Sequence, residues 1–441
     1  MELQDHQKEA IKRLDGGMIY YHGLGTGKTF TSIAATGKYD KVNVVTPASL
    51  RENYKKEIVK AGVKAENYNV GSYDQAQKKA PPTADAIIVD EVHRISEPSS
   101  KRSRAILDIA KSHKTRIGLT ATPIVNRPSD LAPLAHFVDP NSDIPMSRKE
   151  FDKRYIGTHK PNVVAKLFGA RDSNFVSNKK ELKKAFKGRM HYVPGGEKDF
   201  PEVKTEYVDV RMTKPQERLY KTLAHTANPL VAFKVRHMIP LSSQELKTAN
   251  SFMSATRQAS NDPQKFGNHG EGSKVKRAVR DMVEASKKDP NYKGLVYSNY
   301  IKSGTSLMTK ELDANGIPYR IFNGSLGDEV RKKAVADYNS GAAKALLISS
   351  AGAEGLDLKG TKMVQVLEPH WNNNRIRQVI GRAARYKSHD ALPEKERKVV
   401  VRRYQSTLRR GASADVYLND MAKKKDELND KFLEVLKEVG K

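Results

Sequence analysis

The chain has 441 residues, enough for two to three domains, and 38% of them are hydrophobic, enough to form real cores. The 79 Lys and Arg residues outnumber the 51 Asp and Glu residues, giving a formal net charge of +28 that predicts a polyanionic partner, most simply nucleic acid; a dispersed, idle charge or a surface for acidic lipids is the alternative. The absence of cysteine excludes disulfides and thiolate metal sites, and the lack of a signal-like or membrane-length apolar run predicts a soluble, intracellular, cytoplasmic protein.

The first notable stretch is a glycine-rich turn that follows an apolar run at residues 18–21. Its sequence, Gly23-Leu-Gly-Thr-Gly-Lys-Thr29, is typical of a phosphate-binding loop between a strand and a helix. Glycines let backbone N–H groups approach phosphate oxygens, Lys28 would reach the β- and γ-phosphates, and the Thr29 hydroxyl would bind Mg²⁺. His22 stands where the full pattern has a glycine, so a turn that binds nothing is the alternative. The nucleotide-binding residues expected here are Gly23, Gly25, Thr26, Gly27, Lys28 and Thr29.

Residues 3–14, before this loop, have the apolar spacing of a helix. Gln7 lies on that helix, and its amide can read an adenine edge with one donor and one acceptor. A solvated helix residue is the alternative.

A second buried strand is expected over residues 41–47, followed by a helix from residue 48. Thr46 and Ser49 lie at the tip of this strand, where they could contact a phosphate backbone. Ser49 could instead cap the helix.

The run at residues 86–93 predicts a central parallel strand that ends in two carboxylates, Asp90 and Glu91. Open α/β sheets bind their ligands at this end of the strands. Asp90 would hold the same Mg²⁺ as Thr29, and Glu91 would orient and deprotonate the attacking water. Ordinary surface charge is the alternative.

The run at residues 116–123 predicts the next strand, with Thr120 and Thr122 at its tip as hydroxyl donors or turn caps. Four strands with intervening helices predict a doubly wound sheet. From residue 124 to about 290 the pattern loosens into helical, lysine-rich stretches, which could grip a duplex or be solvated faces. The polar, glycine-rich segment 261–273 is expected to be an exposed loop or linker.

A second α/β pattern begins near residue 292 and has no phosphate-binding loop of its own. Strands are expected at 294–299, 319–322, 345–350 and 363–367, with helices at 306–314 and 328–338.

An arginine-rich stretch, residues 375–385, follows the last of these strands. Arg382 and Arg385 lie three apart, so on a helix they share one face. From there they could act as arginine fingers on a transferring γ-phosphoryl group. Simple contact with nucleic-acid phosphate is the alternative, and it is the expectation for many other basic residues between 375 and 410.

In this order the motifs resemble those of superfamily-two helicases and translocases, over roughly residues 1 to 405. The motifs that carry the resemblance are Gln7, Gly25-Thr-Gly-Lys-Thr29, Asp90-Glu-Val-His93, Thr120-Ala-Thr122, Gly355-Leu-Asp-Leu358 and Gln378-Val-Ile-Gly-Arg-Ala-Ala-Arg385.

Finer features resemble the Swi/Snf-type branch of that superfamily. These are a segment similar to its helical protrusion at 131–140, crossover segments at 200–206 and 212–220, and a Trp-Asn segment at 368–372. Residues 371–393, together with a helix near 426–439, are most similar to versions encoded by phages and large DNA viruses. His22 and Asp357 differ from the residues usual in this branch. The sequence of the arginine helix is instead similar to that of general helicases. Strand separation therefore remains an alternative to translocation along duplex DNA.

The resemblance implies two tandem RecA-like lobes, each a doubly wound parallel α/β sheet, with helical insertions and a C-terminal helix. The implied division is an ATP-binding lobe at 1–205 with a helical protrusion from about 124, a crossover and basic insertion at 206–290, a second lobe at 291–410 and a C-terminal helix at 411–441. The implied activity is ATP hydrolysis, with Mg²⁺, that drives translocation on duplex DNA and could unwind or remodel branched DNA. A strand-separating DNA or RNA helicase, or a basic binding factor with a regulatory nucleotide site, is the alternative.

The resemblance also implies roles for individual residues. The catalytic set is Lys28, Glu91, Gln378, Arg382 and Arg385, and Gln7, Asp90, Gly355 and Asp357 join the loop in binding nucleotide. Nucleic-acid contacts are expected from Thr46, Ser49, Ser298, Asn299, Ser349, Ser350 and Trp371, although packing inside the lobe is an equal alternative for Trp371. The implied partners are duplex or branched DNA and replication, recombination or transcription proteins of the host or virus, with the chain acting as a monomer.

Overall fold

The computed structural model describes residues 2–23, 25–159, 173–195, 200–267, 270–349, 356–370 and 373–441. The chain forms two compact units. The first unit comprises Met1–Gly196 together with Lys425–Lys441, and the second comprises Glu197–Lys424. The expected C-terminal segment 411–441 is therefore shared between the units. Among the described residues, no helix has the length and apolar character needed to span a membrane.

The first unit is built around a six-stranded parallel sheet with the order β3-β2-β4-β5-β1-β8. Its strands are β1 (Gly17–His22), β2 (Val42–Thr46), β3 (Tyr68–Ser72), β4 (Ala86–Asp90), β5 (Thr115–Thr120) and β8 (Met190–Val193). Its helices are α1 (Asp5–Lys12), α2 (Lys28–Thr36), α3 (Arg51–Ala61), α4 (Tyr73–Lys78), α5 (Lys101–Lys111), α6 (Leu131–Val138), α7 (Arg148–Tyr155) and α9 (Lys179–Phe186).

Alternate residues of these strands face two different cores, as the two-residue period of a strand requires. Met18 and Tyr20 of β1 pack with α1, α2 and α3, whereas Ile19 and Tyr21 pack with the helices that cover the other face. The sheet is therefore buried on both sides, which explains why its strands read as continuous apolar runs.

Helix α6 opens the segment that resembles a helical protrusion. Leu131, Leu134 and Phe137 are fully buried in the core of the first unit, so α6 packs on the sheet. An antiparallel ribbon, β6 (Ile156–His159) and β7 (Ser173–Val176), forms a separate two-stranded sheet later in the same segment.

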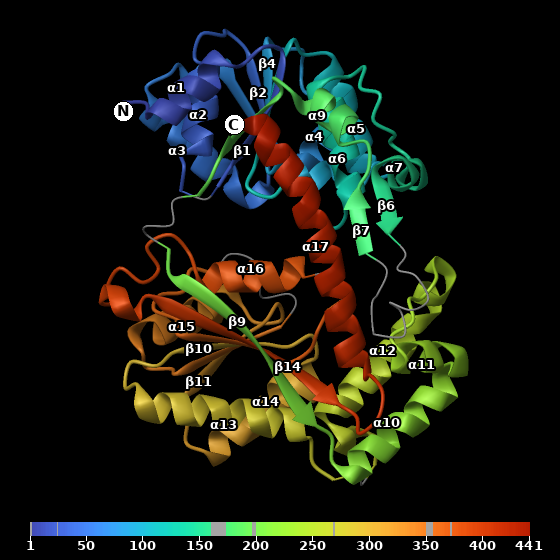
Figure 1. The fold of residues 1–441 in the computed structure, drawn as a ribbon. Helices are drawn as coiled ribbons and strands as arrows, with labels where there is room; N and C mark the ends of the chain where they lie inside the picture. Colours follow the sequence, from blue (N-terminus) through green and yellow to red (C-terminus); the bar gives the residue numbers. More distant parts are fainter. Residues whose placement is uncertain are drawn as a thin grey trace. The chain divides into compact units, whose positions relative to one another are not determined.

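The second unit has its own six-stranded parallel sheet with the order β11-β12-β10-β13-β14-β9. Its strands are β9 (Glu202–Arg211), β10 (Gly294–Tyr297), β11 (Tyr319–Phe322), β12 (Ala345–Ile348), β13 (Met363–Val366) and β14 (Lys398–Thr407). Figure 1 shows β9 beside β14, although almost 190 residues separate them in the sequence, and all ten residues of β9 are paired with β14. The predicted fold class, two doubly wound parallel sheets, is confirmed.

Helices cover both faces of this second sheet and form an additional module. α15 (Asp328–Ser340) and α16 (Asn374–Ala383) pack on one face, and α13 (Ser273–Lys288) and α14 (Ser306–Ala314) pack on the other. A third core joins α10 (Lys214–Ala227), α11 (Pro229–Arg236) and α12 (Ser243–Asn261) to the start of α17 (Ala414–Gly440).

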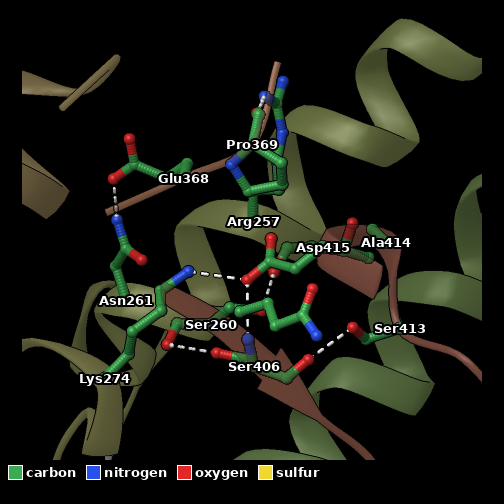
Figure 2. Close-up of polar contacts among 12 residues, drawn as sticks. Arg257, Ser260, Asn261, Lys274, Glu368, Pro369, Ser406, Ser413, Ala414 and Asp415 are labelled. Carbon is green, nitrogen blue, oxygen red and sulfur yellow. Dashed lines mark hydrogen bonds and ion pairs between the residues drawn. The ribbon is translucent and has the colours of Figure 1, made fainter. Parts of the chain in front are cut away.

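A buried polar network lies where α12 and α13 meet the second sheet (Figure 2). Lys274 Nζ donates to Asp415 Oδ2 at 2.7 Å, and both side chains are fully buried. The amide of Asn261 donates to the buried carboxylate of Glu368, and Arg257 Nη1 donates to the carbonyl oxygen of Pro369 at 2.8 Å.

The expectation of an exposed linker at 261–273 is wrong for its two ends. Asn261 and Pro263 are buried, and Gly272 returns so close to Asn261 that a Cβ on the glycine would lie 1.8 Å from the Asn261 carbonyl oxygen. Asn261 is polar because its side chain takes part in the buried network, whereas Gln264, Lys265 and Glu271 of the same segment are exposed.

Candidate functional site

The glycine-rich loop connects β1 to α2, as the sequence predicts. Gly25 and Gly27 have φ values of +78° and +74°, a region that favours glycine. A Cβ at Gly27 would also lie 2.6 Å from the Gln7 amide nitrogen. The positive φ favours glycine at position 27, and a larger residue there would also have to displace the end of the Gln7 side chain.

Lys28 is the first residue of α2, and its ammonium group points back into the loop. Lys28 Nζ donates to the carbonyl oxygen of Gly23 at 2.9 Å, and the Thr26 hydroxyl donates to the same oxygen at 2.8 Å. Burial lowers the pKa of Lys28, while Glu91 and Asp90 act in the opposite direction. The lysine thus lies within electrostatic reach of both acids, as a phosphate-binding lysine beside a Mg²⁺ site would.

Two neighbouring side chains of helix α1 contact the glycine-rich loop. Gln7 Nε2 donates to the Thr26 carbonyl oxygen at 3.4 Å, and His6 Nε2 lies 3.1 Å from the same oxygen. Gln7 Oε1 accepts from the backbone N–H of Gln4 at 2.9 Å, so both ends of this buried amide have partners. A role of Gln7 in reading adenine stays a prediction; its contact with the loop was not expected.

Asp90 ends the central strand β4, and its carboxylate is nearly buried. Thr46 donates its hydroxyl proton to Asp90 Oδ2 at 3.0 Å, and the N–H of Glu91 donates to Oδ1 at 3.0 Å. Burial, followed by the charge of Glu91, raises the pKa of Asp90 to about 6. An acid held this way gains most from a nearby cation, which suits a metal ligand.

Glu91 follows with φ of +53°, which is unusual for a residue with a side chain. The Tyr73 hydroxyl fixes this turn by donating to the carbonyl oxygens of Asp90 and Glu91, at 2.7 and 3.0 Å. His93 Nδ1 lies 3.3 Å from Glu91 Oε2 and 3.0 Å from the Thr120 hydroxyl at the tip of β5. Burial lowers the pKa of His93 to about 4, so at neutral pH its ring is neutral and its contact with Glu91 is not an ion pair.

The expected nucleic-acid contacts differ in exposure. Ser49 lies in an exposed turn, whereas Thr46 is buried and uses its hydroxyl on Asp90. Ser298 and Ser349 are buried at the ends of β10 and β12, and Ser298 donates to Glu368 at 2.8 Å. The buried hydroxyls of Thr46 and Ser298 have internal partners and support the local structure, so the exposed Ser49 and the half-buried Asn299 are more accessible to nucleic acid.

Asn299 has an unusual environment at the end of β10. Its backbone N–H donates to Glu368 at 2.8 Å, and its side-chain oxygen accepts from the Tyr297 hydroxyl at 2.9 Å. Its Nδ2 atom is buried and has no hydrogen-bond partner among the described residues. Ser350, Gly355 and Trp371 lie outside the described residues.

The expectation that Arg382 and Arg385 share one helical face is wrong. Helix α16 ends at Ala383, and Ala384 leaves the helical region with φ of −113° and ψ of 71°. Arg385 therefore lies in the following turn, where its Nη1 donates to the carbonyl oxygen of Leu356 at 3.2 Å and lies 3.7 Å from Asp357 Oδ1. Gln378 is exposed on α16. The finger roles stay predictions.

Sequence reasoning did not assign a role to Tyr73, His6 or the pair formed by His22 and His191. His22 Nε2 and His191 Nδ1 are 2.8 Å apart across β1 and β8, and His22 Nδ1 is buried without a partner among the described residues. The only sequence signal was the departure of His22 from the glycine of the usual pattern. The pairing of β1 with β8 could not be read from the chain.

His22 makes the stability of the first unit depend on pH. Burial, and then His191, His6 and Lys28, lower the pKa of His22 to about 3. Between pH 6.5 and about 3, His22 therefore binds a proton in the unfolded state but not in the folded state. The contribution of His22 to the free energy of unfolding is fully present above pH 6.5 and decreases as the pH falls. At about pH 4 the expected loss from His22 is roughly 3 kcal/mol.

Urea denaturation of the wild type and of His22→Gln, at neutral and acidic pH, measures this effect. The variant should lose less stability on acidification than the wild type. His225→Gln, at an exposed histidine of α10, serves as the control and should behave as the wild type. An unchanged pH dependence in His22→Gln would show that other groups cause it.

Comparisons with known proteins place this chain among helicase-related families. The family model described as "SNF2-related domain" matches residues 68–265, "Helicase conserved C-terminal domain" matches 274–387, and "Type III restriction enzyme, res subunit" matches 1–125. A protein of Acanthamoeba polyphaga mimivirus, named an ATP-dependent RNA helicase, is 30% identical over 98% of this chain and 96% of its own length. A "termination factor NPH-I homolog" of African swine fever virus is 22% identical over 87% of this chain and 68% of its own length.

Among solved structures, the Hef helicase domain of Pyrococcus furiosus has a similar fold, with a TM-score of 0.51 and 15% identity over 91% of this chain and 95% of that one. The identity and coverage of the mimivirus relative, together with the helicase family models, show the family. This chain is an ATP-hydrolysing enzyme that belongs to the Swi/Snf-type branch of the superfamily-two helicases and is similar to members encoded by large DNA viruses.

Proposed function

We propose that this enzyme couples ATP hydrolysis to translocation along duplex DNA. The observation that carries the proposal is the acid pair Asp90–Glu91 at the tip of a central strand, within electrostatic reach of Lys28, in a chain of the Swi/Snf-type branch. The net charge of +28 supports a nucleic-acid track.

The residues present fit a Mg²⁺–nucleotide complex. Gly25 and Gly27 keep side chains out of the loop, and the backbone N–H groups at the start of α2 are available to phosphate oxygens. Asp90 is a buried acid whose raised pKa indicates that a cation would stabilise its charged form. Thr29 lies next to Lys28 at the helix start and offers a hydroxyl ligand.

We assign the following roles to the side chains, and the geometry described above supports those of Lys28, Asp90 and Glu91. Lys28 exchanges the Gly23 carbonyl oxygen for β- and γ-phosphate oxygens, which are stronger acceptors. Thr29 and Asp90 would hold Mg²⁺, which would neutralise phosphate charge. Glu91 orients the attacking water and accepts its proton, and His93 holds the Glu91 carboxylate in place. The motif predicts that Arg382 and Arg385 would stabilise the charge on the transferring phosphoryl group, and these two roles stay predictions.

Steady-state ATPase rates with no nucleic acid, blunt duplex DNA, single-stranded DNA and single-stranded RNA, at fixed salt, test the proposal. Duplex DNA should stimulate the rate most. If the enzyme contacts about six phosphates, its affinity for the duplex should fall by roughly a thousandfold between about 50 and 200 mM salt. Displacement of a third strand from a triplex would then measure movement along the duplex.

A strand-separating helicase is the second candidate, because the mimivirus relative carries the name of an RNA helicase. Stimulation by single strands alone, with RNA above DNA, would favour that candidate and contradict duplex translocation. A lack of response to every nucleic acid would contradict both.

A further inference from the structure

A second candidate site lies in the second unit, in a pocket of about 600 Å³. Its walls come from the residues just before β10, β12 and β13, from the end of α15 and from the turn after α16. These three strands are parallel neighbours, so their amino ends meet at one edge of the sheet. The expected nucleic-acid residues Ser298, Asn299 and Ser349 follow the carboxyl ends of the strands, at the opposite edge.

The pocket concentrates positive charge. Its lining includes four lysines, Lys293, Lys344, Lys359 and Lys387, against one carboxylate, Asp390. Burial, and to a smaller extent the positive charges of Lys344 and Lys362, lowers the pKa of Lys293.

Most of these lysines have neutral partners among the described residues. Lys293 Nζ donates to the carbonyl oxygen of Asn339 at 2.9 Å and lies over the Tyr338 ring. Lys344 donates to the carbonyl oxygen of Pro290, and Lys387 lies over the Tyr386 ring. Lys359 has a carboxylate neighbour, with Nζ 3.4 Å from Asp357. The carboxylates of Asp390 and Asp357 do not balance the four lysines, so a ligand with negative charge would reduce the excess positive charge of the pocket.

The walls of the pocket are fixed by hydrogen bonds. The N–H of Gly360 donates to the carbonyl oxygen of Ser388 at 2.8 Å, and His389 Nε2 lies 2.8 Å from the carbonyl oxygen of Thr361. The Thr361 hydroxyl is 2.9 Å from the hydroxyl of Tyr338. A Cβ at Gly360 would lie 3.3 Å from Lys293 Cε, so this glycine gives the lysine room. The lysines are thus presented by a preformed frame.

We propose that this pocket binds phosphodiester groups of nucleic acid, as a second contact at the edge of the sheet opposite to the expected one. Lysine ammonium groups act as compact point charges, which suit phosphate oxygens. Among the described residues, the lining contributes two apolar side chains, Ala391 and Leu392, beside four lysines, so it suits a charged ligand better than the apolar anchors of a protein interface. The inference that the ligand is a nucleic acid rests on the proposed function. The inference that the pocket binds phosphoryl groups rests on the residues of the pocket alone.

The first test is the affinity of the full-length protein for a short fluorescein-labelled blunt DNA duplex, measured by anisotropy over a range of salt. Lys344→Gln/Lys387→Gln should reduce the slope of log affinity against log salt by about two. The affinity loss should accordingly be roughly tenfold greater at about 50 mM than at about 200 mM salt. Lys387 has φ of +56°, and glutamine bears the same backbone restriction, so the substitution adds no new strain.

Two matched variants separate charge from structure. Lys332→Gln/Lys333→Gln removes the same charge from exposed positions of α15 outside the pocket lining, and it should change the slope less. Lys344→Arg/Lys387→Arg keeps the charge and should restore the slope. Equal slopes in the pocket variant and the α15 control would overturn the proposal.

The second test is amine-reactive labelling of lysines followed by mass spectrometry. The DNA duplex should protect Lys344 and Lys387 from labelling more than Lys332 and Lys333. Protection by inorganic triphosphate or ATP without protection by the duplex would assign the pocket to a free polyphosphate and overturn the nucleic-acid assignment. Protection by none of these would overturn the pocket as an anion site.

The outcomes also separate this inference from the proposed function. One outcome is that duplex DNA protects the two lysines and the pocket variant reduces the salt slope, while the ATPase rate does not respond to duplex DNA. This outcome would support the pocket as a nucleic-acid site and contradict duplex translocation. A duplex-stimulated ATPase with no protection would support the motor and contradict the pocket.

Discussion

Replacement of Glu91 by glutamine is expected to lower kcat for ATP hydrolysis by roughly 100- to 10,000-fold. Glutamine keeps the shape of the side chain but cannot accept the proton of the attacking water. Lys28, Thr29 and Asp90 remain in place, so ATP affinity should change little. Single-turnover hydrolysis and equilibrium binding of a fluorescent ATP analogue measure the two quantities separately.

Glu97→Gln is a matched control, because it makes the same chemical change at an exposed residue of the same segment. It should hydrolyse ATP at the wild-type rate. Nearly full hydrolysis by Glu91→Gln would assign proton transfer to another group. A parallel loss of ATP affinity would instead indicate that the carboxylate supports the binding site.

Replacement of Lys274 by methionine is expected to destabilise the second unit by about 3–5 kcal/mol. The methionine leaves Asp415 buried with the N–H of Ser406, at 2.9 Å from Oδ2, and Asp415 Oδ1 already has no partner among the described residues. Figure 2 shows that the pair joins α13 to the start of α17. Hydrogen exchange of amides in α13 and β14, with urea denaturation, measures the loss where it occurs.

Two further variants test the cause of that loss. Lys276→Met removes a lysine that pairs with Glu271 at the surface, and it should change stability by less than about 1 kcal/mol. Lys274→Met/Asp415→Leu removes both buried charges and should recover much of the stability of the single variant. A Lys274→Met loss as small as that of Lys276→Met would show that the buried pair is not an important contact.

The sequence was a good guide to the central strands. The apolar runs that predict β1, β2, β4 and β5 are buried on both faces, and such runs leave little choice of structure. The strands that were not predicted lie toward the sheet edges. β3 reads Tyr-Asn-Val-Gly-Ser, and β14 carries polar and basic residues along its length. Polar residues interrupt the apolar pattern of both strands, although β14 also carries Val399, Val400 and Val401.

The basic stretch from 375 to 410 shows the same limit. Many of its arginines were expected to contact nucleic-acid phosphate. In the structure, Arg402 Nη1 lies 3.2 Å from Asp281, and Arg403 Nη2 donates to Asn373 at 2.6 Å. A basic residue in a sequence can contact nucleic acid or pair with an acidic residue inside the protein. The sequence does not show which, because the partner can be distant in the chain, as Asp281 is from Arg402.

The site followed a similar division. The glycine spacing and the acid pair predicted the loop and the β4 tip, because both motifs are local. Other contacts depend on how distant segments fold together. These are the hydrogen bond from the Tyr73 hydroxyl to the Asp90 carbonyl oxygen and the contacts of His6 and Gln7 with the Thr26 carbonyl oxygen. The position of Arg385 beyond its helix depends on a C-terminal boundary that helical spacing does not mark.

The composition of the first unit has a consequence for how the protein is made. Phe432, Val435 and Leu436 of α17 are buried in its core, against helices encoded near the other end of the chain. A ribosome adding roughly 5–20 residues per second needs roughly 10 to 50 s to make the intervening second unit. Throughout that interval the nascent nucleotide-binding unit lacks these three side chains, and the apolar surface that they cover in the finished protein is a natural substrate for chaperones.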